Sequence, residues 1–400
     1  MNNQQTTYTP QFFLAALGNG GLTVSLYMYL MFLVKHAGFP MANFEHLYPV
    51  ITGSNYPVAI ATALVSVGII YFAFRHFSLL LWNLKQFSAF KASENFESFK
   101  TGKNALSLMT IPLTLAMSVN VAFILGGAFI PNLWSIVEYL FPFALIAFGL
   151  IGFYAFKTYI DITSPLLIKG GLANDETNHF SRMISSFAFA MVAVGFSASA
   201  AMSHMTLTHT IGFIGAVFFS VISVGVLLVE FAKGIRGVFS KGLAFELSHS
   251  IWIMIPILTI LGITIVRLTA AVSHNLLQTA MPAYFLFIVL SVFFSIQIIF
   301  GIVGYRVMKD NGYFRTFVKE NHSNPGSYAL ICPGVAAFVM GMFFIGWGLI
   351  ETGIMVKYSY VHLGSIALLA IIQYKTIRTM FTLDKKYFAK DNPVVMPASQ

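Results

Sequence analysis

Cys332 has the most distinctive chemistry in the sequence, because it is the only thiol and directly precedes Pro333. A buried lone cysteine is usually a small, inert apolar side chain. A proline within a helix kinks that helix, and a kink here would aim Cys332 toward a possible pore, where the thiol could meet a solute. Both interpretations stay open from the residues alone.

Three charged residues fall toward the outer ends of apolar segments, namely Glu138, Arg267 and Glu351. An arginine between two carboxylates is compatible with a structural bridge. The alternative is an outer vestibule in which Arg267 attracts anions. No Asp, Glu, Lys or Arg is expected at mid-membrane, where ionisable groups mark ion and proton routes, so a carrier driven by a central carboxylate is disfavoured.

The stretch AMSHMTLTH places His204, Met205 and His209 around one turn, and such soft ligands suit copper. Their spacing matches no specific metal signature, so we expect solvated loop residues and no metal. Haem is also disfavoured, because His362 is the one histidine expected clearly inside a span, with His249 at a span end. HExxH, CxxC, GxSxG and phosphate-loop motifs are absent from the sequence, so an enzyme is disfavoured and no cofactor is expected.

Composition sets the class of protein that must position these residues. Of 400 residues 57% are hydrophobic and only 9% are charged, whereas soluble domains carry roughly 25% charged residues. The sequence therefore predicts an all-α polytopic membrane protein and excludes soluble enzymes and nucleic-acid binders. Anionic solutes and membrane lipid are the expected partners.

Ten apolar windows are long enough to cross a bilayer, and together they predict five helical hairpins. They cover residues 11–34, 57–83, 105–130, 133–156, 183–203, 208–232, 247–270, 281–305, 327–350 and 354–378.

The distribution of basic residues predicts the orientation of these spans. Twenty of the 23 Lys and Arg residues fall in the even-to-odd connections and the C-terminal tail, while Lys35, Arg267 and Lys357 fall toward the other side. By the positive-inside rule both termini are cytoplasmic. The first ten residues carry no base, so we expect a retained first span rather than a signal peptide. The expected organisation is a cytoplasmic segment 1–10, a pore domain 11–378 and a cytoplasmic tail 379–400.

A weak repeat marks the odd-numbered spans, each of which carries helix-loosening residues near its start. The main ones are Gly18, Pro112, Gly195, Pro256 and Pro333. Loosened backbone is tolerated where it lines a cavity, so the repeat predicts a central pore lined by the odd-numbered helices. The alternative is the general enrichment of Gly and Pro in transmembrane helices.

Two segments carry a family resemblance: SIWIMIP (Ser250–Pro256) and SYALICPGVAAF (Ser327–Phe338). They resemble the seventh and ninth helices of the family of the tellurite-resistance protein TehA, which includes plant slow anion channels and fungal malate-type carriers. The resemblance implies an anion channel or passive anion transporter, assembled as a homotrimer.

On this match Cys332 occupies the position of the family's pore-gating Phe. A thiol cannot plug a pore alone, so Phe338, Phe343 or another aromatic of the odd helices would have to do so. The chain also resembles the bacterial TsoY group, some of whose members carry selenocysteine, which implies a bacterial inner membrane protein. That likeness keeps open a second function, in which Cys332 acts as a redox or sensor thiol on the pore axis.

Overall fold

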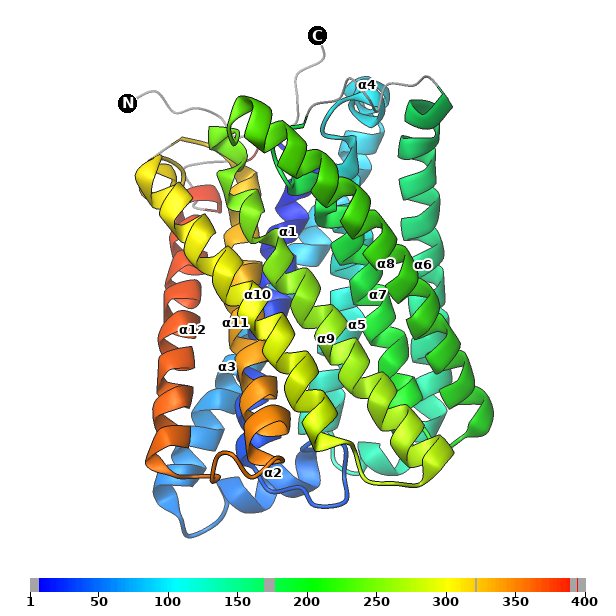
Figure 1. The fold of residues 1–400 in the computed structure, drawn as a ribbon, viewed down its shortest axis with the longest axis vertical. Coiled ribbons are helices and arrows are strands. Elements are labelled where there is room, and N and C mark those ends of the chain that lie inside the picture. The colour runs from blue at the N-terminus through cyan, green and yellow to red at the C-terminus, as the bar shows by residue number, and fades with distance from the viewer. Residues whose placement is uncertain (1–6, 169–176, 321, 389–393, 395–400) are drawn as a thin grey trace.

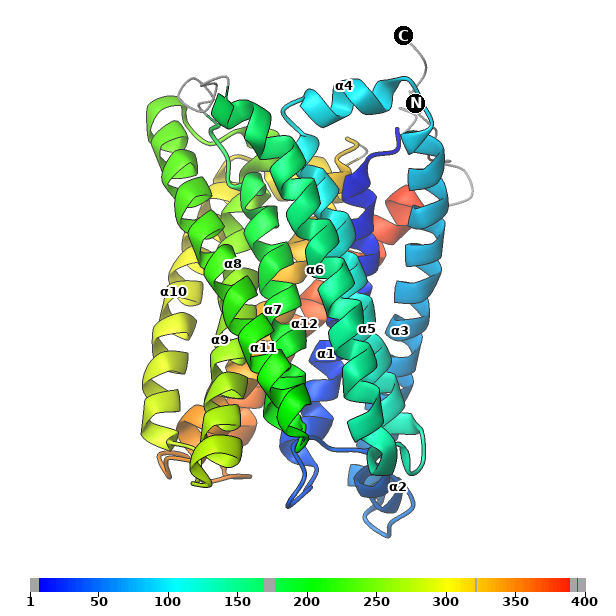
Figure 2. The same cartoon turned by 90° about the vertical axis from the view of Figure 1, so that its right-hand side faces the viewer.

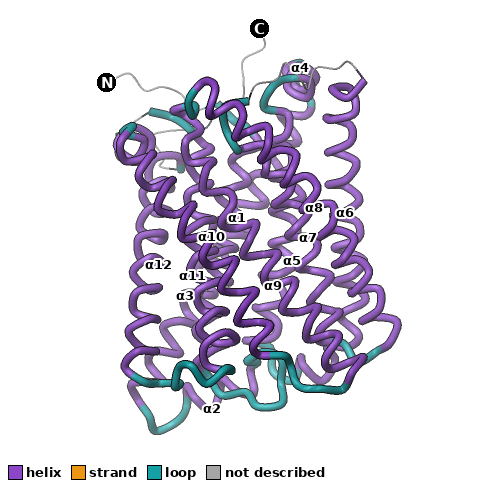
Figure 3. The backbone as a smooth tube through the Cα atoms, viewed as in Figure 1, coloured by secondary structure: helices purple, strands orange, loops and turns teal. Residues whose placement is uncertain are grey.

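The computed structural model describes residues 7–168, 177–320, 322–388 and 394. The chain is 84% helical, and the described part contains no strand. Ten helical segments are long and apolar enough to span a membrane, and Figure 3 shows them running the length of the molecule between loops at both ends. The prediction of an all-α integral membrane protein with ten membrane-length helices is confirmed.

The odd-numbered segments contain α1 (Phe13–Leu33), α5 (Thr110–Phe129), α7 (Ile184–Met202), α9 (Met254–Ala271) and α11 (Ile331–Phe343). The even-numbered segments contain α3 (Tyr56–Lys91), α6 (Val137–Ile168), α8 (Thr206–Lys241), α10 (Ala283–Asp310) and α12 (Tyr360–Tyr387). Two short helices lie in connections, α2 (Phe44–Ile51) and α4 (Asn95–Thr101).

Helix α1 begins and α12 finishes at the same end of the bundle, which is at the top of Figures 1 and 2. We call this the terminal end and the other the opposite end. Helix α4 lies at the terminal end and α2 at the opposite end. Because the chain traverses the bundle ten times, every odd-numbered segment begins at the terminal end.

The odd-numbered helices are the interior of the bundle. In their most apolar windows 61–94% of residues are buried, against 17–33% in the even-numbered helices. Each of α1, α5, α7, α9 and α11 contacts the next, and α11 contacts α1, so the five close into a ring. We call them the inner helices and the others the outer helices. Side chains on the outer helices such as Leu64, Phe74 and Phe143 are exposed, as expected of a lipid-facing surface.

All five inner helices begin in the same way, with a 3-10 segment that leads into the α-helix. These segments are η1 (Pro10–Phe12), η2 (Ala105–Met109), η4 (Ser181–Met183), η5 (Phe245–Ile253) and η8 (Pro325–Leu330). Pro112, Pro256 and Pro333 each occupy the third residue of the α-helix that follows. Proline is tolerated in a first turn because the N–H it lacks has no helical partner there. The prolines therefore mark where the α-helices start, instead of kinking them in mid-span.

Several span ends differ from the sequence prediction. Helices α3 and α8 continue past the predicted ends of their windows, to Lys91 and Lys241. The last span begins at Tyr360 rather than at residue 354, after a loop. An apolar window measures the part of a helix that needs lipid, and a helix can continue into water beyond it.

Side chains in the last turn of α12 form hydrogen bonds to the start of the ninth span and to the connection before it. Asp384 accepts a hydrogen bond from Tyr328 of η8 (2.9 Å) and pairs with Arg75 of α3. Lys386 donates to main-chain carbonyls of the preceding connection, including that of Phe317. The hydroxyl of Tyr387 accepts from the Asn324 N–H (2.7 Å). These contacts fix η8, and with it the start of α11, relative to the outer helices.

Candidate functional site: a basic cavity at the start of the inner helices

A cavity of about 70 Å³ lies within the ring at the terminal end. Every inner span contributes to it, mostly through the 3-10 segment and the first turn of the helix. It is lined by Gln11, Leu14, Lys103, Asn104, Leu106, Ser107, Thr110, Ser181, Arg182, Ile184, Phe187, Leu247, His249, Ser250, Ile253, Pro256, Gly326, Ala329 and Cys332. None of these described lining residues is Asp or Glu, whereas Lys103 and Arg182 are basic, and we call it the basic cavity.

The lining changes along the ring axis. The 3-10 segments and their flanks supply polar side chains such as Ser107, Arg182 and His249. The first turns of the α-helices supply Phe187, Pro256 and the partly exposed Cys332. The basic cavity is therefore polar toward the terminal end and mostly apolar at the level where the α-helices start.

Arg182 is held by a buried ion pair. Its Nε donates to Glu230 of α8 at 2.9 Å, and the two side chains are 8% and 2% exposed. Lys233 lies 3.4 Å from the same carboxylate. Glu230 therefore contacts two bases, and its pair with Arg182 attaches the cavity wall to an outer helix.

His249 is oriented by a buried tyrosine. The hydroxyl of Tyr313 lies 2.9 Å from His249 Nδ1 and 2.9 Å from the Ser327 hydroxyl. Burial raises the pKa of Tyr313 well above its ordinary value, so the phenol is neutral at physiological pH. The hydrogen bonds link the walls contributed by the seventh and ninth spans.

The glycines and aromatics proposed from sequence lie elsewhere. A Cβ on Gly18 would meet Met380 and Ile331, and one on Gly195 would lie 2.2 Å from the Phe148 ring. Both glycines therefore permit close helix packing and do not line the basic cavity.

The two candidate gating aromatics differ in orientation. Phe338 is buried against Tyr29 of α1, with ring centroids 5.1 Å apart, and six residues turn a helix about 120° away from the face that carries Cys332. Phe343 follows Cys332 by eleven residues and returns to within about 20° of that face. Phe343 is also buried, with its ring centroid 5.3 Å from that of Phe32, so both candidates pack against α1.

The predicted bridge between Arg267 and the two outer carboxylates is wrong. Arg267 Nη1 donates to the Val194 carbonyl of α7 at 2.9 Å, and no ion pair joins it to Glu138 or Glu351. Glu351 is exposed in the loop after the ninth span.

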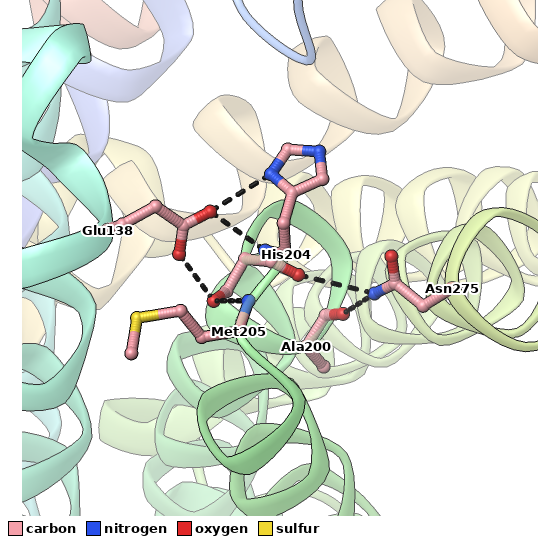
Figure 4. A network of polar contacts seen from close by, with 6 residues as sticks. Glu138, Ala200, His204, Met205 and Asn275 are labelled. Atoms are coloured by element: carbon pink, nitrogen blue, oxygen red, sulfur yellow. Dashed lines mark hydrogen bonds and ion pairs between the residues drawn. The ribbon is translucent and has the colours of Figure 1, made fainter.

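Glu138 instead lies at the opposite end of the bundle, where it joins neighbouring helices through hydrogen bonds, as Figure 4 shows. It accepts hydrogen bonds from the Ser203 hydroxyl (2.6 Å) and the His204 N–H (2.8 Å). Asn275, in the π-helical segment η6 (Val272–Leu277), donates to the Ala200 carbonyl at 3.1 Å. The network links the ends of α6, α7 and the seventh span.

The histidines provide no cluster for a metal. His204 Nδ1 lies 2.9 Å from Glu138 Oε1, Met205 precedes α8, and His209 lies in its first turn. Within the described ranges no group of three or more His, Cys, Asp and Glu side chains could hold a metal ion.

The expectation that His362 is the one histidine clearly inside a span is wrong, because the second span contains another, His76. His362 is the third residue of α12, close to its start, and its N–H donates to Ser359. His76 of α3 is the fully buried one, between the Ala16 carbonyl (2.7 Å) and the Ser118 hydroxyl (2.8 Å). A single histidine does not stand out in the strongly apolar second span. Its hydrogen-bond partners are Ala16 and Ser118, and neither is a histidine.

A second cavity, of about 300 Å³, lies between α5 and η3–α6 (η3, Leu133–Ile136). Apolar side chains such as Phe123 and Trp134 line it, together with Gly126 and Gly127. None of the described side chains that line it is charged.

The sequence interpretation missed the polar residues of the basic cavity, above all Arg182 and His249. The sequence pattern predicts a connection for Arg182 and a span end for His249. The signal that could have found them is their place just before the apolar stretches of odd-numbered spans, where the starts of five helices converge.

Comparison with known proteins adds no relative, since no family model, no curated protein and no solved structure matches this chain. The fold itself defines the class, an α-helical integral membrane protein with five inner helices enclosed by five outer ones.

Proposed function

We propose that the protein is an anion channel or passive anion transporter whose pathway follows the axis of the five inner helices. The observation that carries this proposal is the basic cavity, which all five inner spans line and whose described lining includes Lys103 and the ion-paired Arg182 but no acid. A basic cleft raises the local concentration of anions by electrostatic focusing.

The backbone supports the same sign of charge. The five inner α-helices begin around the basic cavity, so the positive ends of their dipoles meet there. Cys332 would form part of the constriction, and Arg267 would attract anions from the opposite end. A lining of hydroxyls and small residues passes a solute without holding it tightly, as conduction requires.

We further propose the setting that the sequence predicts. The terminal end faces the cytoplasm of a bacterial inner membrane, and three copies assemble as in the TehA family, each with its own pore. The bias of Lys and Arg toward this end supports the orientation, and the resemblance supports the trimer.

Anion flux in proteoliposomes, before and after a small membrane-permeant thiol reagent, tests the proposal. We expect flux that reverses with the gradient and that the reagent reduces, because Cys332 is the only thiol and lines the cavity. Absence of flux for monovalent and divalent anions alike would contradict it.

A second candidate is a membrane redox protein or thiol sensor that uses Cys332, and the observation favouring it is that Cys332 is partly exposed in the cavity. A lone thiol needs a small external thiol to resolve its oxidised form. Labelling of Cys332 by the reagent in protein that carries no flux would favour this candidate.

A further inference from the structure

Arg267 is exceptional among the charged residues of the inner spans. These spans are fully described, and Arg182 and Arg267 are their only Lys or Arg residues. Arg182 lies at the terminal end with Glu230 as its partner. Arg267 lies eleven residues beyond Pro256 along α9, about 16 Å further along the axis. That is about half the ~30 Å thickness of a bilayer core.

Helix geometry aims Arg267 at the ring axis. Eleven residues make about three full turns, so Arg267 shares a face of α9 with Pro256, which lines the basic cavity. Its acceptor is the Val194 carbonyl of α7, and Val194 follows the cavity residue Phe187 by about two turns. Both partners therefore continue the cavity-lining faces of their helices toward the opposite end.

The guanidinium is only partly used by the protein. Nη1 donates to the Val194 carbonyl at 2.9 Å, and that carbonyl also accepts from the Ser197 hydroxyl (2.8 Å). Nε and Nη2 donate to no group in the described part of the chain. Both nitrogens keep some solvent-accessible surface. Nε–H and Nη2–H form one edge of the planar group, the fork that binds two oxygens side by side.

The charge of Arg267 is also unbalanced. No carboxylate within the described ranges pairs with it, and Glu246 is the only acid on the inner spans, at the terminal end. A charge inside a membrane domain is costly unless it is paired. A bound anion would supply both the missing charge and the missing acceptors.

We propose that Arg267 is the central anion-binding site of the pathway, and that its ligand is a small monovalent anion presenting two oxygens on one side, such as formate or nitrate. One positive charge balances one negative charge, so a dianion would bring an uncompensated charge into the helical bundle. The free fork favours two-oxygen anions over chloride. This inference rests on the proposed function, because an anion reaches the site along the same axis.

Thermal unfolding of the purified full-length protein tests the site without relying on transport. The probes are sodium formate, nitrate, chloride and sulfate at matched ionic strength. We expect formate and nitrate to raise the unfolding midpoint more than chloride does, and sulfate to have no specific effect. R267Q should weaken formate binding by at least about tenfold, because the charge and the fork are both lost.

Two further variants make the test specific. R267K keeps the charge without the fork, so it should bind anions but lose the preference for formate over chloride. K357Q, which removes an exposed cation at the opposite end, should behave as the wild type. In the absence of anions R267Q should unfold no earlier than the wild type, since an unbalanced charge has been removed.

A formate response that is unchanged in R267Q, or a wild-type midpoint that responds to none of the anions, would overturn the site. Flux separates this failure from failure of the proposed function. Flux that persists in R267Q with unaltered formate-to-chloride selectivity contradicts the site alone. Anion binding at Arg267 without wild-type flux contradicts the transport function alone.

Discussion

At the scale of single residues, Cys332 joins the sequence interpretation to the structure. The sequence singled it out as the lone thiol before Pro333, and the structure places it in the lining of the basic cavity, to which Pro256 and Phe187 also belong.

Replacing Cys332 with phenylalanine should close the pathway. The cavity is only about 70 Å³, so a ring at this position would fill the constriction, and we expect anion flux to fall by at least about tenfold. Flux into proteoliposomes measures the effect. C332A is the matched control and should retain flux while losing sensitivity to thiol reagents; equal flux in C332F and C332A would contradict a pathway past this residue.

Glu230 should be essential for stability. Removing one partner of a buried ion pair costs about 3–5 kcal/mol, because the other charge is left uncompensated. We expect E230Q to lower the thermal unfolding midpoint substantially, since Glu230 serves both Arg182 and Lys233. E246Q, at an exposed carboxylate, is the control. An unchanged midpoint in E230Q would show that the pair is dispensable.

Sequence reasoning located Arg267 on the correct span but misjudged its surroundings. Helical side chains point toward the helix N-terminus, so the guanidinium reaches Val194, deeper than its position in the chain suggests. The spacing of residues in the sequence does not reveal that Arg267 and Glu138 are unpaired. Glu138 accepts hydrogen bonds from Ser203 and His204 instead. Tertiary contacts between distant segments decide such partners.

At the scale of elements, the pairing of α7 with α8 depends on a close backbone approach. A Cβ on Gly212 would lie 2.7 Å from the Ala200 nitrogen and 2.9 Å from the Phe196 oxygen. Main-chain atoms cannot move aside as a flexible side chain can, so the two helices would have to separate.

We therefore expect G212A to destabilise the protein by about 1–3 kcal/mol, the usual effect of overpacking. Gly225 lies on the same helix with no atom within 4 Å of an added Cβ, so G225A should change stability by no more than about 0.5 kcal/mol. Thermal unfolding of the two variants in the same detergent provides the measurement. Equal midpoints would contradict the close approach.

The elements also show which features of the fold a sequence reveals. The ten spans were predictable because charged connections separate the apolar windows. The recurrence of Pro112, Pro256 and Pro333 was visible as well, but the sequence did not show that these prolines mark the starts of the α-helices. Mid-helix kinks and helix starts both tolerate proline, and only the register of the preceding 3-10 segments distinguishes them.

At the scale of the whole molecule, the predicted orientation can be tested with single cysteines in a C332A background. Ser98 is exposed on α4 at the terminal end, and Ser54 is exposed beyond α2 at the opposite end. We expect a membrane-impermeant maleimide to label S54C on intact spheroplasts and S98C only after permeabilisation. The reverse pattern would place the termini outside the cytoplasm.

The ring closes where α11 contacts α1, and this closure has a consequence for biosynthesis. The two helices start about 320 residues apart in the chain, a length that the ribosome adds in roughly 16–64 s at 5–20 residues per second. During that interval the first span is inserted while its partner has not yet been translated, and Arg267 enters the bilayer before the ring encloses it. Until the ninth span arrives the ring therefore stays open on one side of α1, which α3 and α5 already contact but α11 does not.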